Sequence, residues 1–192
     1  MNKGRLEAFT DAVIAIAATI MVLELHVPEE VSLHALAEDW PIIIAYIFSF
    51  WIIYMVWFSH HNVFNKAKFI STRTFMLNGL WLFTLTLVPV TTAWVGKHAN
   101  QTLPEVCYLA VLLLWSIAFQ LMDESVLKDN PGLPRDSANR EGIRWWLYGG
   151  YAVGIIIAFF WPLISLLVVG LISACLSVEL LRTKPTPRQS HE

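Results

Sequence analysis

Polar and charged residues that a lipid bilayer disfavours lie near the ends of three apolar segments. They are Arg5, Thr10, Asp11, His60, His61 and Asn78. On a helix that turns about 100° per residue, Arg5 and Asp11 point to nearly opposite sides, so their partners must come from other segments. Ionisable groups inside a membrane are costly, and they either fasten helices together or mark a path for ions. The spacing predicts a polar cluster that joins three helices, and fastening alone is the simpler interpretation.

Other kinds of chemistry have little support in the sequence. His60 and His61 are adjacent, so their rings diverge by about 100° on a helix, and no HExxH or HxxxH spacing predicts a metal site. Cys107 and Cys175 lie in apolar stretches without a CxxC neighbour, which predicts neither a disulfide framework nor a zinc site. No nucleophile and base pair and no phosphate-binding loop is recognisable, so we expect neither an enzyme nor a bound cofactor.

The composition is typical of a membrane protein. Of the 192 residues, 56% are hydrophobic and 15% are charged, whereas soluble domains carry about 25% charged residues. The mean hydropathy is +0.56, which argues against a water-soluble globule. The formal net charge is −2, and without a basic surplus we expect no nucleic-acid partner.

Long runs without charge predict the membrane-spanning helices, because a helix rises about 1.5 Å per residue and must cross about 30 Å of hydrocarbon. Such runs extend over Pro41–Ser59, Thr74–Gly96, Val106–Met122 and Trp145–Val178. The last run has 34 residues, too many for one crossing, and Trp161-Pro162 is the expected turn because proline favours the first position of a helix.

The N-terminal apolar run is predicted to be a helix of the mature protein. Asp11 interrupts it, no small-residue cleavage site follows Leu25, and Pro28 ends it, so it does not resemble a signal peptide. We therefore expect one all-α integral membrane domain, 1–192, with a cytoplasmic loop at 124–141 and a cytoplasmic tail at 183–192. The six expected transmembrane helices are 7–27, 37–60, 70–96, 104–123, 142–161 and 163–182.

The distribution of basic residues predicts the orientation. Cytoplasmic loops are enriched in Lys and Arg. With both termini in the cytoplasm, that side holds every Lys and Arg of the chain except Lys97. We therefore expect a multi-pass protein of the cell (plasma) membrane with both termini cytoplasmic and lipid as its surroundings.

The first helix carries a stripe of residues that has two interpretations. Ile16, Thr19, Ile20 and Leu23 share one face, and alanines lie beside it. Small and apolar residues at this spacing are typical of helix packing in membranes. The alternative is a pore wall, in which copies of Ile and Leu from several subunits form an apolar constriction.

The start of the chain resembles a known family. Arg5-x-x-x-Phe9-Thr10-Asp11 is similar to the RxxxFSD signature of the transmembrane protein 175 family of endolysosomal and bacterial potassium channels, with Thr in place of Ser. The resemblance continues through residues 12–28, His60-His61-x-x-Phe64, Leu77-Asn78 and Leu87-Val88-Pro89. It covers about half of the chain.

This resemblance implies a homotetramer, with six helices per subunit and the first helix around a central pore that conducts potassium passively. It places the hydrophobic gate at Ile16, further pore layers at Ile20 and Leu23, and a selectivity layer at Thr19. It also implies a network that supports the pore helix. That network would consist of Arg5, Phe9, Thr10, Asp11, His60, His61 and Asn78.

Two other functions remain open, and the expected selectivity is modest. The sequence has no TVGYG-like filter, so preference for potassium over sodium would come from pore width, hydration and Thr19. A proton-coupled secondary transporter could use Asp11 with His60 or His61 as a relay, although no internal repeat or broken helix favours it. A membrane scaffold that conducts no ions is the third possibility.

Overall fold

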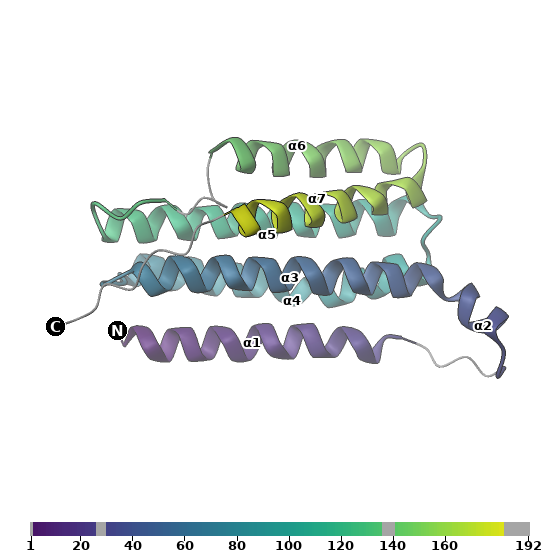
Figure 1. Cartoon of the computed structure of the whole chain (residues 1–192), viewed down its shortest axis with the longest axis horizontal. Coiled ribbons are helices and arrows are strands. Elements are labelled where there is room, and N and C mark those ends of the chain that lie inside the picture. The colour runs from purple at the N-terminus through teal and green to yellow at the C-terminus, as the bar shows by residue number, and fades with distance from the viewer. Residues whose placement is uncertain (1, 26–29, 136–140, 183–192) are drawn as a thin grey trace.

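Six long helices and one short helix make up the part of the chain that the computed structural model describes, residues 2–25, 30–135 and 141–182 (Figure 1). The helices are α1 (Lys3–Leu23), α2 (Leu33–Glu38), α3 (Trp40–Lys66), α4 (Thr72–Lys97), α5 (Thr102–Asp129), α6 (Glu141–Ala158) and α7 (Pro162–Arg182). The fold class is all-α, in agreement with the sequence.

The long helices lie side by side and alternate in direction. In Figure 1, α6 lies at one edge, α5 and α7 follow, then α3 and α4, and α1 lies at the opposite edge. Most contacts of α1 are with α3 and α4. The helix expected to line the pore is therefore at the periphery of its own bundle, and one of its faces is free of contacts with the other described helices.

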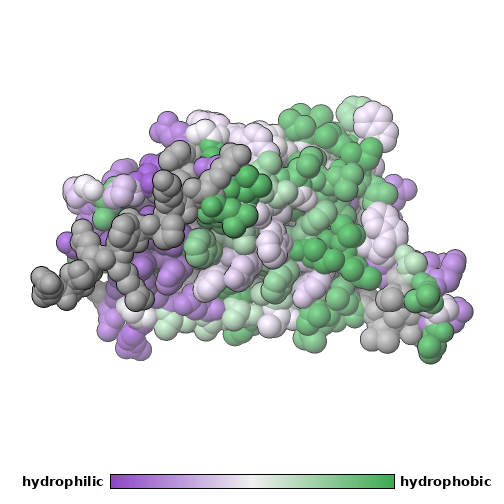
Figure 2. Space-filling view, in the orientation of Figure 1, coloured by the Kyte–Doolittle hydropathy of each residue, from purple (hydrophilic) through white to green (hydrophobic). Residues whose placement is uncertain are grey.

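The bundle has the length and surface of a multi-pass membrane protein. Five helices, α1, α3, α4, α5 and α7, are long and apolar enough to cross a bilayer. The 18-residue α6 is not among these five, so its crossing stays a prediction. Figure 2 shows hydrophilic residues gathered at the end where α1 begins and apolar residues over much of the other half.

Two helices, α3 and α5, extend beyond the expected ranges at this hydrophilic end. The expected loop 124–141 begins too early, because residues 124–129 continue α5 and bury Ser125 and Val126. Similarly, α3 continues from 60 to Lys66 because Val63 and Phe64 are buried. The sequence predicted that each helix would end where hydropathy falls. In the structure both helices continue beyond that point, because their next residues are buried against other parts of the chain.

The first helix is shifted toward the N-terminus relative to the expected range 7–27. It begins at Lys3 because the Oδ1 atom of Asn2 accepts a hydrogen bond from the backbone N–H of Arg5. It ends at Leu23, and residues 26–29, including the proline expected to stop it, lie outside the described residues. The expected cytoplasmic tail, 183–192, also lies outside them.

The expected turn in the last long apolar run lies between α6 and α7. The former ends at Ala158 and the latter begins at Pro162, where a missing backbone N–H costs nothing in the first turn of a helix. A buried hydrogen bond from Ser165 Oγ to Glu105 Oε2, 3.0 Å long, joins the start of α7 to the start of α5.

The bundle core is built around aromatic residues and one buried group of hydroxyls. Trp81 and Tyr108 are fully buried. Ser49 Oγ lies 2.8 Å from Thr92 Oγ1 and 2.7 Å from Tyr108 Oη, so α3, α4 and α5 are joined by hydroxyl contacts inside the apolar core. These contacts hold together the helices against which α1 is placed.

Candidate functional site

One face of α1 is buried against α3 and α4. Its buried residues recur every three or four positions, as expected for one side of a helix. They are Leu6, Thr10, Ile14, Ala17 and Met21. Thr10 is the polar member of this set, and its side chain is fully buried. Burial of a hydroxyl inside an apolar interface requires a hydrogen-bond partner.

The opposite face of α1 carries the predicted gate residues and is uncovered. The exposed fractions are 57% for Ile16, 44% for Ile20, 80% for Leu23 and 62% for Phe9. Thr19 is exposed on the same side. None of these residues belongs to the core formed by the described residues, so the apolar stripe does not serve packing within that part of the chain.

Thr19 is oriented by its own helix. Its hydroxyl lies 2.9 Å from the backbone oxygen of Ala15 and 3.0 Å from that of Ile16, and it donates to them. Because a hydroxyl has one donor and two acceptor lone pairs, the oxygen of Thr19 retains acceptor capacity on the exposed face. That arrangement suits contact with a cation or with the water around it.

Thr10, Asn78 and His60 form a buried chain of hydrogen bonds across α1, α4 and α3, which we call the polar anchor. Asn78 Nδ2 donates to Thr10 Oγ1 over 2.9 Å, and His60 Nε2 lies 3.0 Å from Asn78 Oδ1. An amide oxygen can only accept, so Nε2 of His60 carries the proton and donates. The three side chains are at most 1% exposed.

Aromatic rings hold His60 in place. Its ring stacks on Phe64 with centroids 4.2 Å apart and on Trp81 with centroids 4.8 Å apart, at interplanar angles of 17° and 8°. Such a sandwich leaves the imidazole little freedom to rotate, so its hydrogen bond to Asn78 is preorganised. The anchor therefore fixes both the depth and the rotation of α1 at Thr10.

Asp11 has a different partner from the histidines that the sequence suggested. Trp57 of α3 donates from Nε1 to Asp11 Oδ1 over 2.9 Å. His61 is exposed, and its ring contact is with Trp57, at 6.3 Å between centroids. His60 is bonded to Asn78, whereas Asp11 is bonded to Trp57. Asp11 and His60, the two groups of the suggested proton relay, therefore have separate partners.

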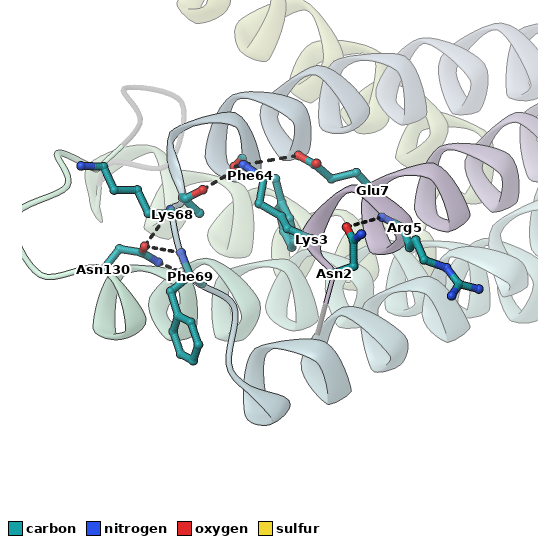
Figure 3. A network of polar contacts seen from close by, with 9 residues as sticks. Asn2, Lys3, Arg5, Glu7, Phe64, Lys68, Phe69 and Asn130 are labelled. Atoms are coloured by element: carbon teal, nitrogen blue, oxygen red, sulfur yellow. Dashed lines mark hydrogen bonds and ion pairs between the residues drawn. The ribbon is translucent and has the colours of Figure 1, made fainter.

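Arg5 and Phe9 do not join these hydrogen bonds. Both are exposed, and they are four residues apart on the side of α1 that turns away from α3 and α4. In Figure 3 the guanidinium of Arg5 points away from the other labelled side chains, and it has no hydrogen bond or ion pair to any residue that the structure describes. Their side chains are available to whatever lies against this face.

Sequence reasoning missed three contacts of α1. The hydrogen bond from Trp57 to Asp11 is the first of them. At the start of α1, the ammonium of Lys3 binds backbone oxygens at the end of α3. At the other end, Lys97 of α4 forms a 3.0 Å ion pair with Glu24. The signal for this pair was the position of Lys97, the basic residue expected outside the cytoplasm.

Comparison with known proteins supports the resemblance seen in the sequence. Residues 5–89 match the model of the family described as endosomal/lysosomal potassium channel TMEM175. A protein of Chryseobacterium sp. (strain P1-3), named as a potassium channel, is 35% identical over 169 residues, which cover 86% of this chain and 88% of that protein. A Chamaesiphon minutus protein, also named as a potassium channel, is 36% identical over 62% of this chain and 63% of its own length.

The three-dimensional structure agrees with these matches. A crystal structure described as a lysosomal potassium-selective channel TMEM175 homolog from Chamaesiphon minutus superposes with a TM-score of 0.80. The two sequences are 28% identical, and the superposed region covers 92% of this chain and 96% of the other. By these sequence relatives and by its structural likeness to the Chamaesiphon minutus protein, the chain belongs to the TMEM175 family.

Proposed function

We propose that this chain is a potassium channel of the cell membrane, in which α1 from each of four identical subunits lines a central pore. Its relatives from Chryseobacterium and Chamaesiphon are named as potassium channels, and the superposed structure is described as potassium-selective. Conduction is passive and needs no cofactor, with potassium as the permeant ion. No covalent chemistry takes part.

The uncovered apolar face of α1 is the observation that carries this proposal. A narrow face on one peripheral helix encloses a path only when it is repeated around an axis, as in a cyclic oligomer. Four copies would bring the exposed Ile16, Ile20 and Leu23 side chains together as three layers. The proposed number of subunits, four, is the one that the resemblance to the family implies.

These layers act as an apolar constriction. A ring of isoleucine side chains blocks ions when it is dry and conducts when water enters it. Potassium sheds part of its hydration shell at the Ile16 ring, and the Thr19 oxygens replace some of the lost water contacts. Selectivity over sodium is modest, because one layer of hydroxyls replaces fewer of the water molecules around the ion than a filter of backbone carbonyls does.

The buried residues of the polar anchor support this pore from outside. Asn78 donates to Thr10 and accepts from His60, and Trp57 donates to Asp11, so the pore helix is attached to α3 and α4. The surplus of Lys and Arg at the end where α1 begins favours a cytoplasmic location for that end. Glu24 and Lys97 then lie at the outer mouth of the pore.

The oligomeric state provides the first test. The tetramer predicts a particle of four times the chain mass of 21.8 kDa when native mass spectrometry is carried out from mild detergent. Disulfide crosslinking of a Leu23→Cys variant, with Cys107 and Cys175 replaced by serine, should yield linked dimers. A monomer that gives no crosslink at any protein concentration would contradict an α1-lined pore.

Lys97→Met is expected to raise potassium conductance at low salt. Loss of the ammonium frees the Glu24 carboxylates, which makes the potential at the outer mouth more negative and concentrates cations there. We expect an increase of about twofold at ~10 mM salt, where the Debye length is about 30 Å, and none near 1 M, where it is about 3 Å.

Glu24 provides the matched control for this change. Glu24→Gln should lower conductance at low salt because it leaves the Lys97 ammonium without its carboxylate partner. The double variant should return close to wild type. Single-channel recording across a salt series measures all three proteins, and a Lys97→Met effect that does not fade at high salt would contradict a charge at the mouth.

A further inference from the structure

A second attachment point of α1 lies about two turns before the polar anchor. The ammonium of Lys3 donates to the backbone oxygens of Phe64 and Ala67, each over 2.8 Å (Figure 3). Phe64 is in the last turn of α3 and Ala67 is its C-terminal cap residue. The Phe64 oxygen also accepts from the backbone N–H of Ala67 over 3.0 Å, and a cation is favourable near the last carbonyls of a helix.

Lys3 is placed against the dipole of its own helix. It is the first residue of α1, and the first turn of α1 contains no acidic residue. A cation at a helix N-terminus is unfavourable for that helix. Glu7 offsets part of the charge from one turn away, at 3.9 Å. The favourable contacts of Lys3 are therefore those with α3, and they act between helices.

The segment that receives Lys3 is itself held firmly. Asn130, which follows α5, accepts from the backbone N–H groups of Lys68 and Phe69 over 2.8 and 2.9 Å and donates to Phe69 O over 2.8 Å. Asp129 accepts from Ser71 N over 2.8 Å. Through these bonds, the residues between α3 and α4 are fixed to the end of α5, so Lys3 ties α1 to a rigid support.

Two attachment points determine the direction of a helix, whereas one leaves it free to pivot. Lys3 and Thr10 are about 10 Å apart along α1, and Leu23 lies about 20 Å beyond Thr10, at about 1.5 Å per residue. A tilt of about 5° around Thr10 would move Leu23 by about 1.7 Å and Ile16 by about 0.8 Å. Such shifts would change the width of an apolar constriction, which blocks or conducts ions according to whether water enters it.

We propose that Lys3 is a positioning residue of the pore: its bonds to Phe64 and Ala67 set the tilt of α1 and thereby the width of the constriction at Ile16. This inference rests on the proposed function, in which α1 lines the pore. In this proposal Lys3, which lies outside the Arg5–Asp11 motif, controls permeation at the Ile16 constriction several turns away.

Bi-ionic reversal potentials with potassium and sodium on opposite sides of a planar bilayer test this role. Lys3→Met should lower the potassium-to-sodium permeability ratio about twofold, a shift of about 18 mV, since a tenfold change for one charge corresponds to about 59 mV. Lys3→Arg should keep the wild-type ratio because guanidinium can also donate to two carbonyls. Lys68→Met removes a charge at the same end of the bundle and should change nothing.

The outcomes separate the two proposals. A wild-type ratio in Lys3→Met, or an equal shift in Lys68→Met, overturns the role of Lys3 while leaving potassium conduction intact. Absence of any wild-type potassium current overturns the proposed function instead. Hydrogen exchange then tests the contact directly: faster exchange in the first two turns of α1 in Lys3→Met, and not in Lys68→Met, supports the attachment, and equal exchange refutes it.

Discussion

Ile16→Asn is expected to raise potassium conductance and to lower selectivity over sodium. An amide side chain keeps water in the narrowest layer, so an ion retains more of its hydration shell as it passes. A gain of about tenfold in conductance corresponds to a barrier lower by about 1.4 kcal/mol. Single-channel recording in planar bilayers measures the conductance, and reversal potentials measure the selectivity.

Leu114→Asn provides the matched control. Leu114 of α5 is 54% exposed, against 57% for Ile16, but it lies on a helix that is not proposed to line the pore. The Leu114→Asn variant introduces the same amide at an equally exposed apolar position, and its currents should equal those of wild type. Unchanged currents in Ile16→Asn at matched amounts of tetramer would remove Ile16 from the constriction.

Asn78→Leu is expected to lower the stability of the protein because it removes both bonds of the polar anchor. Leucine has a similar size and cannot bind Thr10 or His60, so a buried hydroxyl and a buried imidazole lose their partner. Hydrogen bonds between membrane helices contribute about 0.6 kcal/mol on average and at most about 1.7. The loss in free energy of unfolding should therefore be about 1–3 kcal/mol.

Thermal unfolding in detergent, followed by tryptophan fluorescence, measures this loss. Asn65→Leu is the control, because Asn65 is an exposed asparagine in the last turn of α3 and its replacement leaves the anchor intact. Asn78→Leu should also increase hydrogen exchange around Thr10. An unfolding temperature equal to that of Asn65→Leu would show that the anchor contributes nothing to the attachment of α1.

The number and approximate ranges of the long helices followed from the sequence because charge-free runs report directly on burial in lipid. Pro162 marks the start of α7 for a local reason, since the first turn of a helix tolerates a missing N–H. The ends of α3 and α5 did not follow, because their last residues are polar in composition and are helical through contacts with distant residues. Asn130, for example, is bonded to Phe69.

The members of the polar cluster could be predicted, but their pairing could not. A sequence gives the depth of Thr10, Asn78 and His60, whereas their bonds depend on the rotation of three helices about their axes. Trp57 was overlooked as a partner of Asp11 because a tryptophan near a helix end is typical of a membrane interface. Lys3 was counted only as a cytoplasmic charge, since its acceptors are backbone carbonyls that leave no mark in the sequence.

The position of Arg5 and Phe9 has a bearing on assembly. Both belong to the motif that identifies the family, but they face away from α3 and α4 and have an exposed surface in one chain. In the proposed tetramer this surface meets neighbouring subunits and the cytoplasmic entrance of the pore. The motif therefore has two sides. Thr10 and Asp11 attach α1 to its own bundle, and Arg5 and Phe9 face the neighbouring subunits and the pore entrance of the proposed tetramer.

Access to position 16 during potassium flux tests the α1-lined pore most directly. Proteoliposomes would carry Ile16→Cys or Ile14→Cys in a chain whose Cys107 and Cys175 are serine, and a charged thiol reagent would be added under a potassium gradient. Ile14 is buried on the opposite face of α1. The expected result is potassium flux that the reagent blocks in Ile16→Cys and leaves unchanged in Ile14→Cys. Equal block in both variants, or flux that requires a proton gradient, would contradict a passive pore lined by the exposed face of α1.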